Sequence, residues 1–208
     1  MGKDFSELTG MELDALREIG NIGAGNAATA LAQMVQTKID MSVPEVNILP
    51  FDEIPKLVGG ADAPVCGLYF EVSGSIRGSI LFMLPIERAG LLVDMILARP
   101  LGETDLNLGV ELEFSVIMEV GNIISGTYLN ALSHFTNMKL LTSVPALAID
   151  MAGAILNGIL AQVGAVFDDV LVLKTMFTRE DRDIVGHFFM MPDSESLSTI
   201  LQGLGVNC

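Results

Sequence analysis

Two segments of this chain carry the same polar side chains at the same spacing. Glu18 and Asn21 lie three residues apart, and so do Glu119 and Asn122. On a helix, residues at this spacing share one face. An amide can orient a water molecule for in-line attack on a phosphoryl group, and a carboxylate can pair with a basic residue of the phosphorylated molecule. The pairs therefore predict assisted hydrolysis of a bond that is already labile and is brought by a partner.

Each pair belongs to a longer pattern. Asp14 and Gly25 flank the first pair, and Ser115 and Gly126 flank the second. The Asp or Ser lies one turn before the Glu, and the Gly lies one turn past the Asn. A merely solvated helix face would explain one copy. It gives no reason for two copies to keep Glu and Asn while neighbouring positions diverge.

The two patterns are part of an internal repeat. Residues 11–49 align without a gap on residues 112–150, and 13 of these 39 positions are identical, including Ser-Val-Pro at 42–44 and 143–145. We interpret residues 1–208 as a single domain built from two repeats, about 9–104 and 108–208.

Each repeat is predicted to begin with a long amphipathic helix, which in the first repeat starts at a capping box from Thr9 to Glu12. Pro44 favours an edge position or a bulge in the strand that follows. The predicted elements are helix 9–35, strand 38–49, helix 52–58, strands 65–72 and 76–84 joined through Ser73-Gly74-Ser75, helix 86–98, helix 109–137, strand 139–149, helix 151–163, strands 165–177 and 184–191 and helix 194–204.

Hairpins in place of regular β-α-β alternation predict an α+β fold, with a largely antiparallel sheet flanked by helices. Because the repeats are similar, we expect an internally duplicated, pseudo-twofold arrangement around one continuous core.

The composition narrows the class of protein. Half of the 208 residues are apolar, and 11 basic residues face 26 acidic ones, for a net charge of −15. The first 104 residues hold 7 basic and 14 acidic side chains and the rest hold 4 and 12, so the two halves of the chain carry −7 and −8. Such acidity disfavours nucleic acids and anionic membrane surfaces as partners.

The location is expected to be cytoplasmic, because the start of the chain lacks an apolar signal core and only Cys66 and Cys208 occur. The most apolar run free of charge, residues 151–167, contains Gly, Asn and Gln. It is therefore expected to be a core helix and not a membrane insertion.

Other candidate sites are weaker. Residues 23–28 fit the Gly-x-Gly-x-x-Ala form of a dinucleotide fingerprint, but no strand precedes them and Gly23 is replaced by Ile124 in the second repeat. His134, His187 and Cys66 lie outside the repeated pattern and are expected to be structural. We therefore expect neither a bound cofactor nor a metal site in this chain.

The doubled D/S-x-x-x-E-x-x-N-x-x-x-G pattern, in a duplicated acidic chain of this length, resembles the CheC–CheX–FliY family of chemotaxis phosphatases. Two motifs in 208 residues favour the CheC type within it. The resemblance implies hydrolysis of the aspartyl phosphate of the response regulator CheY. By motif position, Asn21 and Asn122 would position the attacking water, and Glu18 and Glu119 would anchor the regulator through a lysine. Magnesium would come bound to the regulator.

The resemblance also implies a second partner, the receptor deamidase CheD. The helix at 151–163 carries more apolar residues than one buried stripe requires. Either it is simply a more buried helix, or Asp150, Met151 and Ile155 form the contact with CheD. The alternative to catalysis is an adaptor that sequesters CheD or phosphorylated CheY.

Overall fold

The sheet interleaves strands from the two repeats. The computed structural model describes residues 8–35, 38–163, 169–179 and 182–205. Within them, seven strands form one sheet in the order β1-β6-β7-β3-β2-β4, with β5 also pairing with β2, and every pairing is antiparallel. The strands are β1 Asp40–Pro50, β2 Pro64–Gly74, β3 Gly78–Pro85, β4 Leu140–Thr142, β5 Ala146–Met151, β6 Asp169–Arg179 and β7 Arg182–Pro192.

This order exchanges the first strand between repeats. β1 of the first repeat pairs with the β6–β7 hairpin of the second, whereas β4 and β5 of the second repeat pair with β2 of the first. The two hairpins meet at β3 and β7, which marks the centre of the duplication. The predicted α+β, duplicated, antiparallel fold is confirmed.

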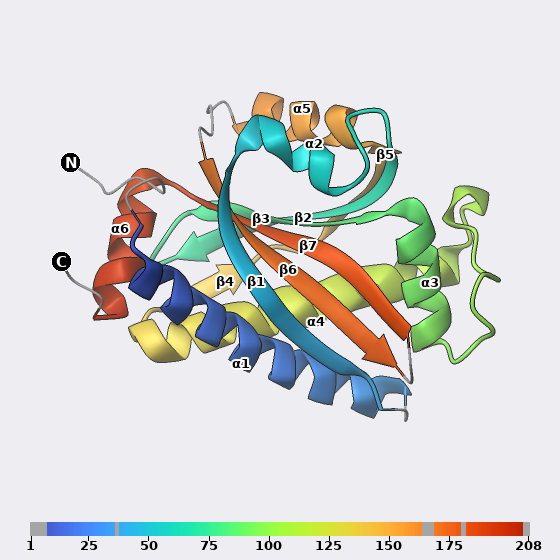
Figure 1. Ribbon diagram of the computed structural model, residues 1–208, viewed down its shortest axis with the longest axis horizontal. Coiled ribbons are helices and arrows are strands. Elements are labelled where there is room, and N and C mark those ends of the chain that lie inside the picture. The colour runs from blue at the N-terminus through green and yellow to red at the C-terminus, as the bar shows by residue number, and fades with distance from the viewer. Residues whose placement is uncertain (1–7, 36–37, 164–168, 180–181, 206–208) are drawn as a thin grey trace.

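The helices cover both faces of the sheet. They are α1 Gly10–Val35, α2 Ile54–Leu57, α3 Ile86–Ile96, α4 Glu111–Thr136, α5 Ala152–Val163 and α6 Ser194–Gly203, with short 3-10 turns η2 Phe51–Glu53 and η3 Leu106–Leu108. α1 and α4 run side by side in opposite directions, and α2 and α5 lie together on the other side of the sheet (Figure 1). α3 lies near the start of α4 and α6 near its end (Figure 1).

The buried apolar side chains form two clusters, not the one continuous core expected from the sequence. The larger cluster lies between the sheet and α1 and α4, and includes Leu16, Phe70, Leu132 and Phe188. The smaller one lies under α2 and α5 around Phe189. Both clusters draw on both repeats. The expectation failed because helices cover both faces of the sheet, and the sheet itself separates the two layers.

The strand predicted at 139–149 is wrong in its middle. The structure divides it into β4 and β5, with residues 143–145 between them in no strand. Pro145 cannot donate to a strand ladder, which explains why the pairing stops there. In the first repeat the same tripeptide stays within β1, where Pro44 lies at a bulge on the edge of the sheet, as predicted.

Smaller differences concern element ends. β2 extends through Gly74, so the predicted turn at 73–75 lies one or two residues later. The predicted helix at 52–58 divides into η2 and α2, and Met151 ends β5 instead of starting α5. Parts of the predicted strand 165–177 and of the turn after it lie outside the described residues. No helix among the described residues is long and apolar enough to cross a membrane.

Candidate functional site

The two repeated patterns lie on the exposed faces of α1 and α4. Asp14, Glu18, Asn21 and Gly25 are exposed on α1, whereas Leu16 and Ile19 are buried against the sheet. On α4, Ser115, Glu119 and Asn122 are exposed and Gly126 is half-buried, whereas Ile117 and Val120 are buried. Each helix therefore buries its apolar stripe and presents all four pattern positions at or near the surface, as the spacing predicts.

A glycine beside each asparagine brings its helix close to the sheet. A Cβ atom on Gly20 would lie 3.1 Å from Leu173 Cδ2, and one on Gly121 would lie 2.5 Å from Leu68 Cδ1. A larger residue would lift the helix from the sheet. These matching glycines thus set the depth at which Asn21 and Asn122 emerge on the outer side.

The start of α1 is fixed by the predicted capping box. The Thr9 N–H and hydroxyl donate to Glu12 Oε2 at 2.7 and 2.8 Å, and the Glu12 N–H donates back to Thr9 Oγ1 at 3.4 Å. These bonds satisfy backbone donors that a helix N-terminus otherwise leaves free. They begin α1 one turn before Asp14.

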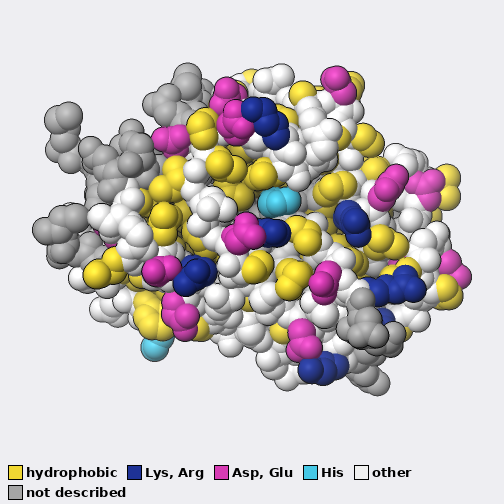
Figure 2. All heavy atoms as spheres, viewed as in Figure 1, with side chains coloured by type: hydrophobic (Ala, Val, Ile, Leu, Met, Phe, Trp, Pro, Cys, Tyr) yellow, Lys and Arg dark blue, Asp and Glu magenta, His cyan; other side chains and the backbone are white. Residues whose placement is uncertain are grey.

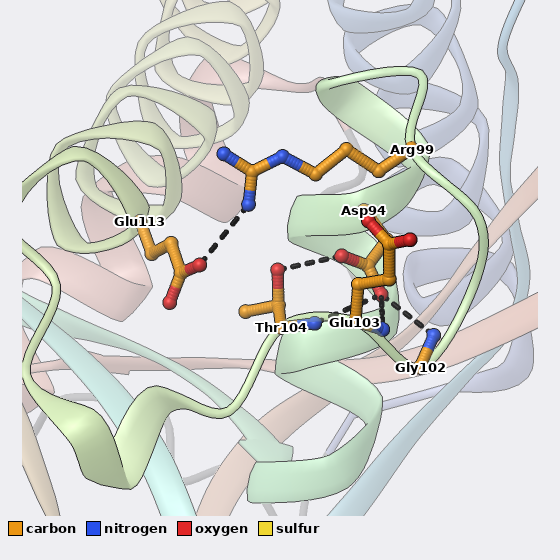
Figure 3. A network of polar contacts seen from close by, with 6 residues as sticks. All are labelled: Asp94, Arg99, Gly102, Glu103, Thr104 and Glu113. Atoms are coloured by element: carbon orange, nitrogen blue, oxygen red, sulfur yellow. Dashed lines mark hydrogen bonds and ion pairs between the residues drawn. The ribbon is translucent and has the colours of Figure 1, made fainter.

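The start of α4 is held differently, by a network that the sequence did not predict (Figure 3). Glu113, the counterpart of Glu12, is buried and accepts a hydrogen bond at 3.1 Å from Arg99 on the α3–α4 linker, residues 97–110. Asp94 of α3 is fully buried, and its Oδ2 accepts bonds from three successive N–H groups of that linker, while Oδ1 accepts from the Thr104 hydroxyl at 2.6 Å. The sequence feature that could have indicated this network is the glutamate that both repeats keep at matching positions, Glu12 and Glu113.

In the first site, Asn21 is held by the sheet. Its Oδ1 accepts a hydrogen bond at 2.9 Å from the backbone N–H of Val43 in β1. Asp14 pairs with Arg17 at 3.0 Å on the surface of the same helix. The Glu18 carboxylate is exposed, and no donor within the described residues reaches it. The acceptor end of the amide is therefore engaged, while the carboxylate is available.

The second site has the same residues in a different arrangement. Asn122 Nδ2 lies 3.5 Å from Glu119 Oε2, at the long limit for a hydrogen bond. The Ser115 hydroxyl donates to the Glu111 carbonyl within its own helix at 2.9 Å. Ser115 therefore does not replace the ion pair of Asp14, and Met118 stands where the first repeat has Arg17.

Among the described residues, none packs against the position that a side chain on either pattern glycine would occupy. A Cβ atom on Gly25 or Gly126 would meet nothing within 4 Å, and neither residue has a positive φ. Glycine inside a helix lowers its stability by roughly 0.5–1 kcal/mol relative to alanine. Both helices thus keep a destabilising residue that the fold does not require, as expected where another molecule approaches the backbone closely.

Two of the remaining titratable candidates, Cys66 and His187, are buried. Burial raises the pKa of the Cys66 thiol to about 12. Burial first, and then the charge of Lys174, lower the pKa of His187 to about 4. Cys66 therefore stays a thiol and His187 stays neutral near pH 7. His134 is exposed on α4 beside Phe135.

Two further features of the sequence have a place in the structure. Residues 23–28 lie in the middle of α1, not at the turn between a strand and a helix that a dinucleotide fingerprint requires. Among the described residues, no group of three His, Cys, Asp or Glu side chains could hold a metal ion.

The surface seen in Figure 2 mixes acidic, basic and apolar side chains, so the negative charge of the chain forms no single acidic patch on this face. The expected CheD contact lies at the end of β5 and in α5. Asp150 is exposed and its Oδ1 accepts from the Met151 N–H at 2.7 Å, while Met151 is 49% exposed. Ile155 is half-buried against Gly67 of β2.

Comparison with known proteins agrees with the repeat. The CheC-like family model matches residues 11–48 and 112–149, which are the two long helices and the segments that follow them. The chain is 34% identical over 206 residues to the CheY-P phosphatase CheC of Bacillus subtilis (strain 168), covering 98% of each. It is 28% identical over 142 residues to the flagellar motor switch phosphatase FliY of the same organism, covering 68% of this chain and 36% of FliY.

Solved structures share the fold. Thermotoga maritima FliY superimposes with a TM-score of 0.75 at 20% identity, covering 96% of this chain and 98% of that one. The FliM middle domain from H. pylori gives a TM-score of 0.68 at 12% identity, covering 94% and 99%. The family-model match to both repeats and the 34% identity to a CheC over 98% of the chain show that this chain belongs to the CheC-like family.

Proposed function

We propose that this protein hydrolyses the aspartyl phosphate of the chemotaxis response regulator CheY. The observation that carries the proposal is the pair of exposed Glu and Asn side chains at matched positions on α1 and α4. A relative that is 34% identical over nearly the whole chain is a CheY-P phosphatase, which supports this choice of reaction.

This chain needs only to position the attacking water and the regulator, since an acyl phosphate is already activated. Asn21 or Asn122 orients a water molecule in line with the phosphorus–oxygen bond to the aspartyl group. The water oxygen bonds to phosphorus as that bond breaks, which releases a free carboxylate and inorganic phosphate with one proton passing to solvent. Magnesium bound to the regulator neutralises charge on the phosphoryl oxygens.

Glu18 and Glu119 serve as anchors in this proposal. An exposed carboxylate one turn from the asparagine can pair with a lysine beside the regulator's phosphorylation site. Gly25 and Gly126, one turn beyond the asparagine, leave the helix backbone open to the regulator. The functional face is then a strip of three helical turns, used once on each helix.

The test follows phosphorylated CheY over time with substoichiometric protein. The double variant Asn21→Ala, Asn122→Ala should lose the acceleration, since removing one positioned polar group costs roughly 10²–10³ in rate at each site. Each single variant should retain the activity of the other site. Decay that stays accelerated with the folded double variant would overturn the proposal.

A second variant separates catalysis from simple sequestration. Glu18→Lys with Glu119→Lys should abolish regulator binding while the thermal midpoint stays close to that of the wild type. A protein that only sequesters phosphorylated CheY would slow its decay or leave the decay unchanged. It would not turn over more than one equivalent of phosphorylated CheY.

We also propose that CheD docks on Asp150, Met151 and Ile155. The observation that favours this surface is the exposed side chain of Met151 beside the exposed carboxylate of Asp150, at the start of α5, which lies on the opposite side of the sheet from both motif helices. Asp150→Lys should weaken CheD binding in a pull-down with purified proteins and leave CheY dephosphorylation unchanged. Loss of both activities together would contradict separate surfaces.

A further inference from the structure

The two sites differ in how the asparagine is held, and the difference originates in β1. Ser42 pairs with Met176 and Glu45 with Lys174, so Val43 and Pro44 both lie opposite Thr175 and form a β-bulge. Pro44 has no N–H to offer to the ladder. The Val43 N–H instead donates to Asn21 Oδ1 at 2.9 Å, and the Val43 side chain is only 3% exposed.

This hydrogen bond fixes which end of the Asn21 amide faces the sheet. A backbone N–H can only donate, so the atom that it meets must be the amide oxygen. The Nδ2 group therefore points away from Val43, and the side chain is exposed on the outer face of α1. Both the rotamer and the orientation of the amide are set before any partner binds.

The second repeat carries the same Ser-Val-Pro sequence but does not make this contact. Thr142 pairs with Val72 and Ala146 with Tyr69, so residues 143–145 lie opposite only two residues of β2. There Val144 is 85% exposed, where Val43 is buried. Within the described part of the chain, no backbone N–H donates to the Asn122 side chain.

Asn122 is also turned toward the residue that should bind the regulator. Its Nδ2 lies 3.5 Å from Glu119 Oε2, so the amide donor and the anchoring carboxylate face each other. A regulator that pairs with Glu119 must compete with this contact, and the amide must then be ordered during the reaction.

We infer that the Val43 N–H is a positioning group for Asn21 and that the two sites are unequal, with the first ordered in advance and the second ordered only on binding. This inference rests on the proposed function for its kinetic part. Ordering a side chain costs about 0.5–1.5 kcal/mol, so the first site should turn over about 2- to 10-fold faster than the second.

The structural part is tested without any phosphatase assay, by hydrogen exchange at the Val43 amide. Asn21→Ala removes the acceptor and should speed exchange of this amide at least about 10-fold, whereas Asn21→Asp keeps an oxygen there and should preserve protection. Amides of β6 and β7 report global stability and should not change. In the matched control, Asn122→Ala should leave exchange at Val144 unaltered. Unchanged exchange at Val43 in Asn21→Ala would overturn the inference.

The kinetic part compares variants with one site each. Asn122→Ala leaves the first site and should show the higher kcat, and Asn21→Ala leaves the second and should show the lower. Asn21→Asp with Asn122→Ala keeps the bond to Val43 but lacks the amide donor, so it should be inactive although its Val43 amide stays protected. Equal or reversed kcat values would contradict unequal sites. If neither the wild type nor any variant dephosphorylates CheY, the proposed function is wrong. The exchange result at the Val43 amide then still tests whether Val43 positions Asn21.

Discussion

Gly23 on α1 packs directly against the backbone of Tyr128 on α4. A Cβ atom on Gly23 would lie 2.9 Å from Tyr128 Cα and 3.3 Å from its nitrogen. This contact joins the middle of α1 to a point about one turn past the middle of α4. Gly23 lies two residues after Asn21, and Tyr128 lies six residues after Asn122. The spacing of the two sites therefore depends on one position that tolerates no side chain.

Gly23→Ala should destabilise the protein by about 1–3 kcal/mol, since the new methyl group meets rigid backbone and not the end of a flexible side chain. Alanine's higher helix propensity recovers only part of this cost. Chemical denaturation monitored by circular dichroism measures the effect. A variant as stable as the wild type would mean that α1 and α4 can separate freely.

Gly25→Ala with Gly126→Ala should have the opposite effect on stability. No atom lies within 4 Å of either new methyl group, so each change should add about 0.5–1 kcal/mol to the free energy of unfolding. The same methyl groups should obstruct the regulator, raising KM for phosphorylated CheY about 10-fold or more if the interface is tightly packed.

Gly10→Ala is the matched control for these variants. It too meets nothing within 4 Å, but it lies at the start of α1, before the four pattern positions. It should leave KM unchanged. A stabilised Gly25, Gly126 double variant with wild-type KM would show that the regulator does not approach these glycines.

Much of the site was predictable because it depends on local periodicity. The spacing of Glu18 and Asn21 determines their shared helix face, and the apolar stripe that includes Leu16 and Ile19, which is buried, determines that this face points outward. The bulge at Pro44 followed from the missing N–H of proline. These features depend on a few neighbouring residues, which is why periodicity and proline chemistry were sufficient.

The remaining features depend on contacts between distant segments. The same Ser-Val-Pro sequence buries Val43 and exposes Val144, since β1 pairs with the second repeat while β4 and β5 pair with β2. Sequence alone carries no signal for this exchange of strands. The bond from Val43 to Asn21 follows from this exchange, and the two-layered core follows from helices that cover both faces of the sheet, so neither was predicted.

Asp94→Ala should destabilise the α3–α4 linker. The buried carboxylate accepts three backbone N–H bonds and one hydroxyl bond from residues 102–104, and hydrogen bonds to a charged group contribute about 1.5–3 kcal/mol each. We expect a loss of about 3 kcal/mol or more in denaturation experiments. Asp94→Asn should be milder, because its amide can accept from the N–H groups and donate to Thr104 Oγ1.

Asp105→Ala provides the comparison for this linker. Its side chain accepts from the Asn107 N–H at the exposed start of η3, so its loss should cost only about 1 kcal/mol. Because the linker leads into α4, Asp94→Ala should reduce dephosphorylation by the second site more than by the first. Equal loss at both sites would indicate a global effect instead.

His187 should make the protein less stable in acid. Its folded-state pKa is lowered to about 4 from 6.5, chiefly by burial, with Lys174 lowering it further and Glu45 opposing this. The unfolded chain therefore binds a proton between these values while the folded chain does not, so stability falls as the pH drops from 6.5 to 4. The histidine's contribution to this loss is about 3 kcal/mol.

His187→Phe should flatten the pH dependence of the denaturation midpoint in this window, with His134→Gln as the control for removing a histidine. An unchanged slope in His187→Phe would show that the folded protein takes up this proton at an ordinary pKa.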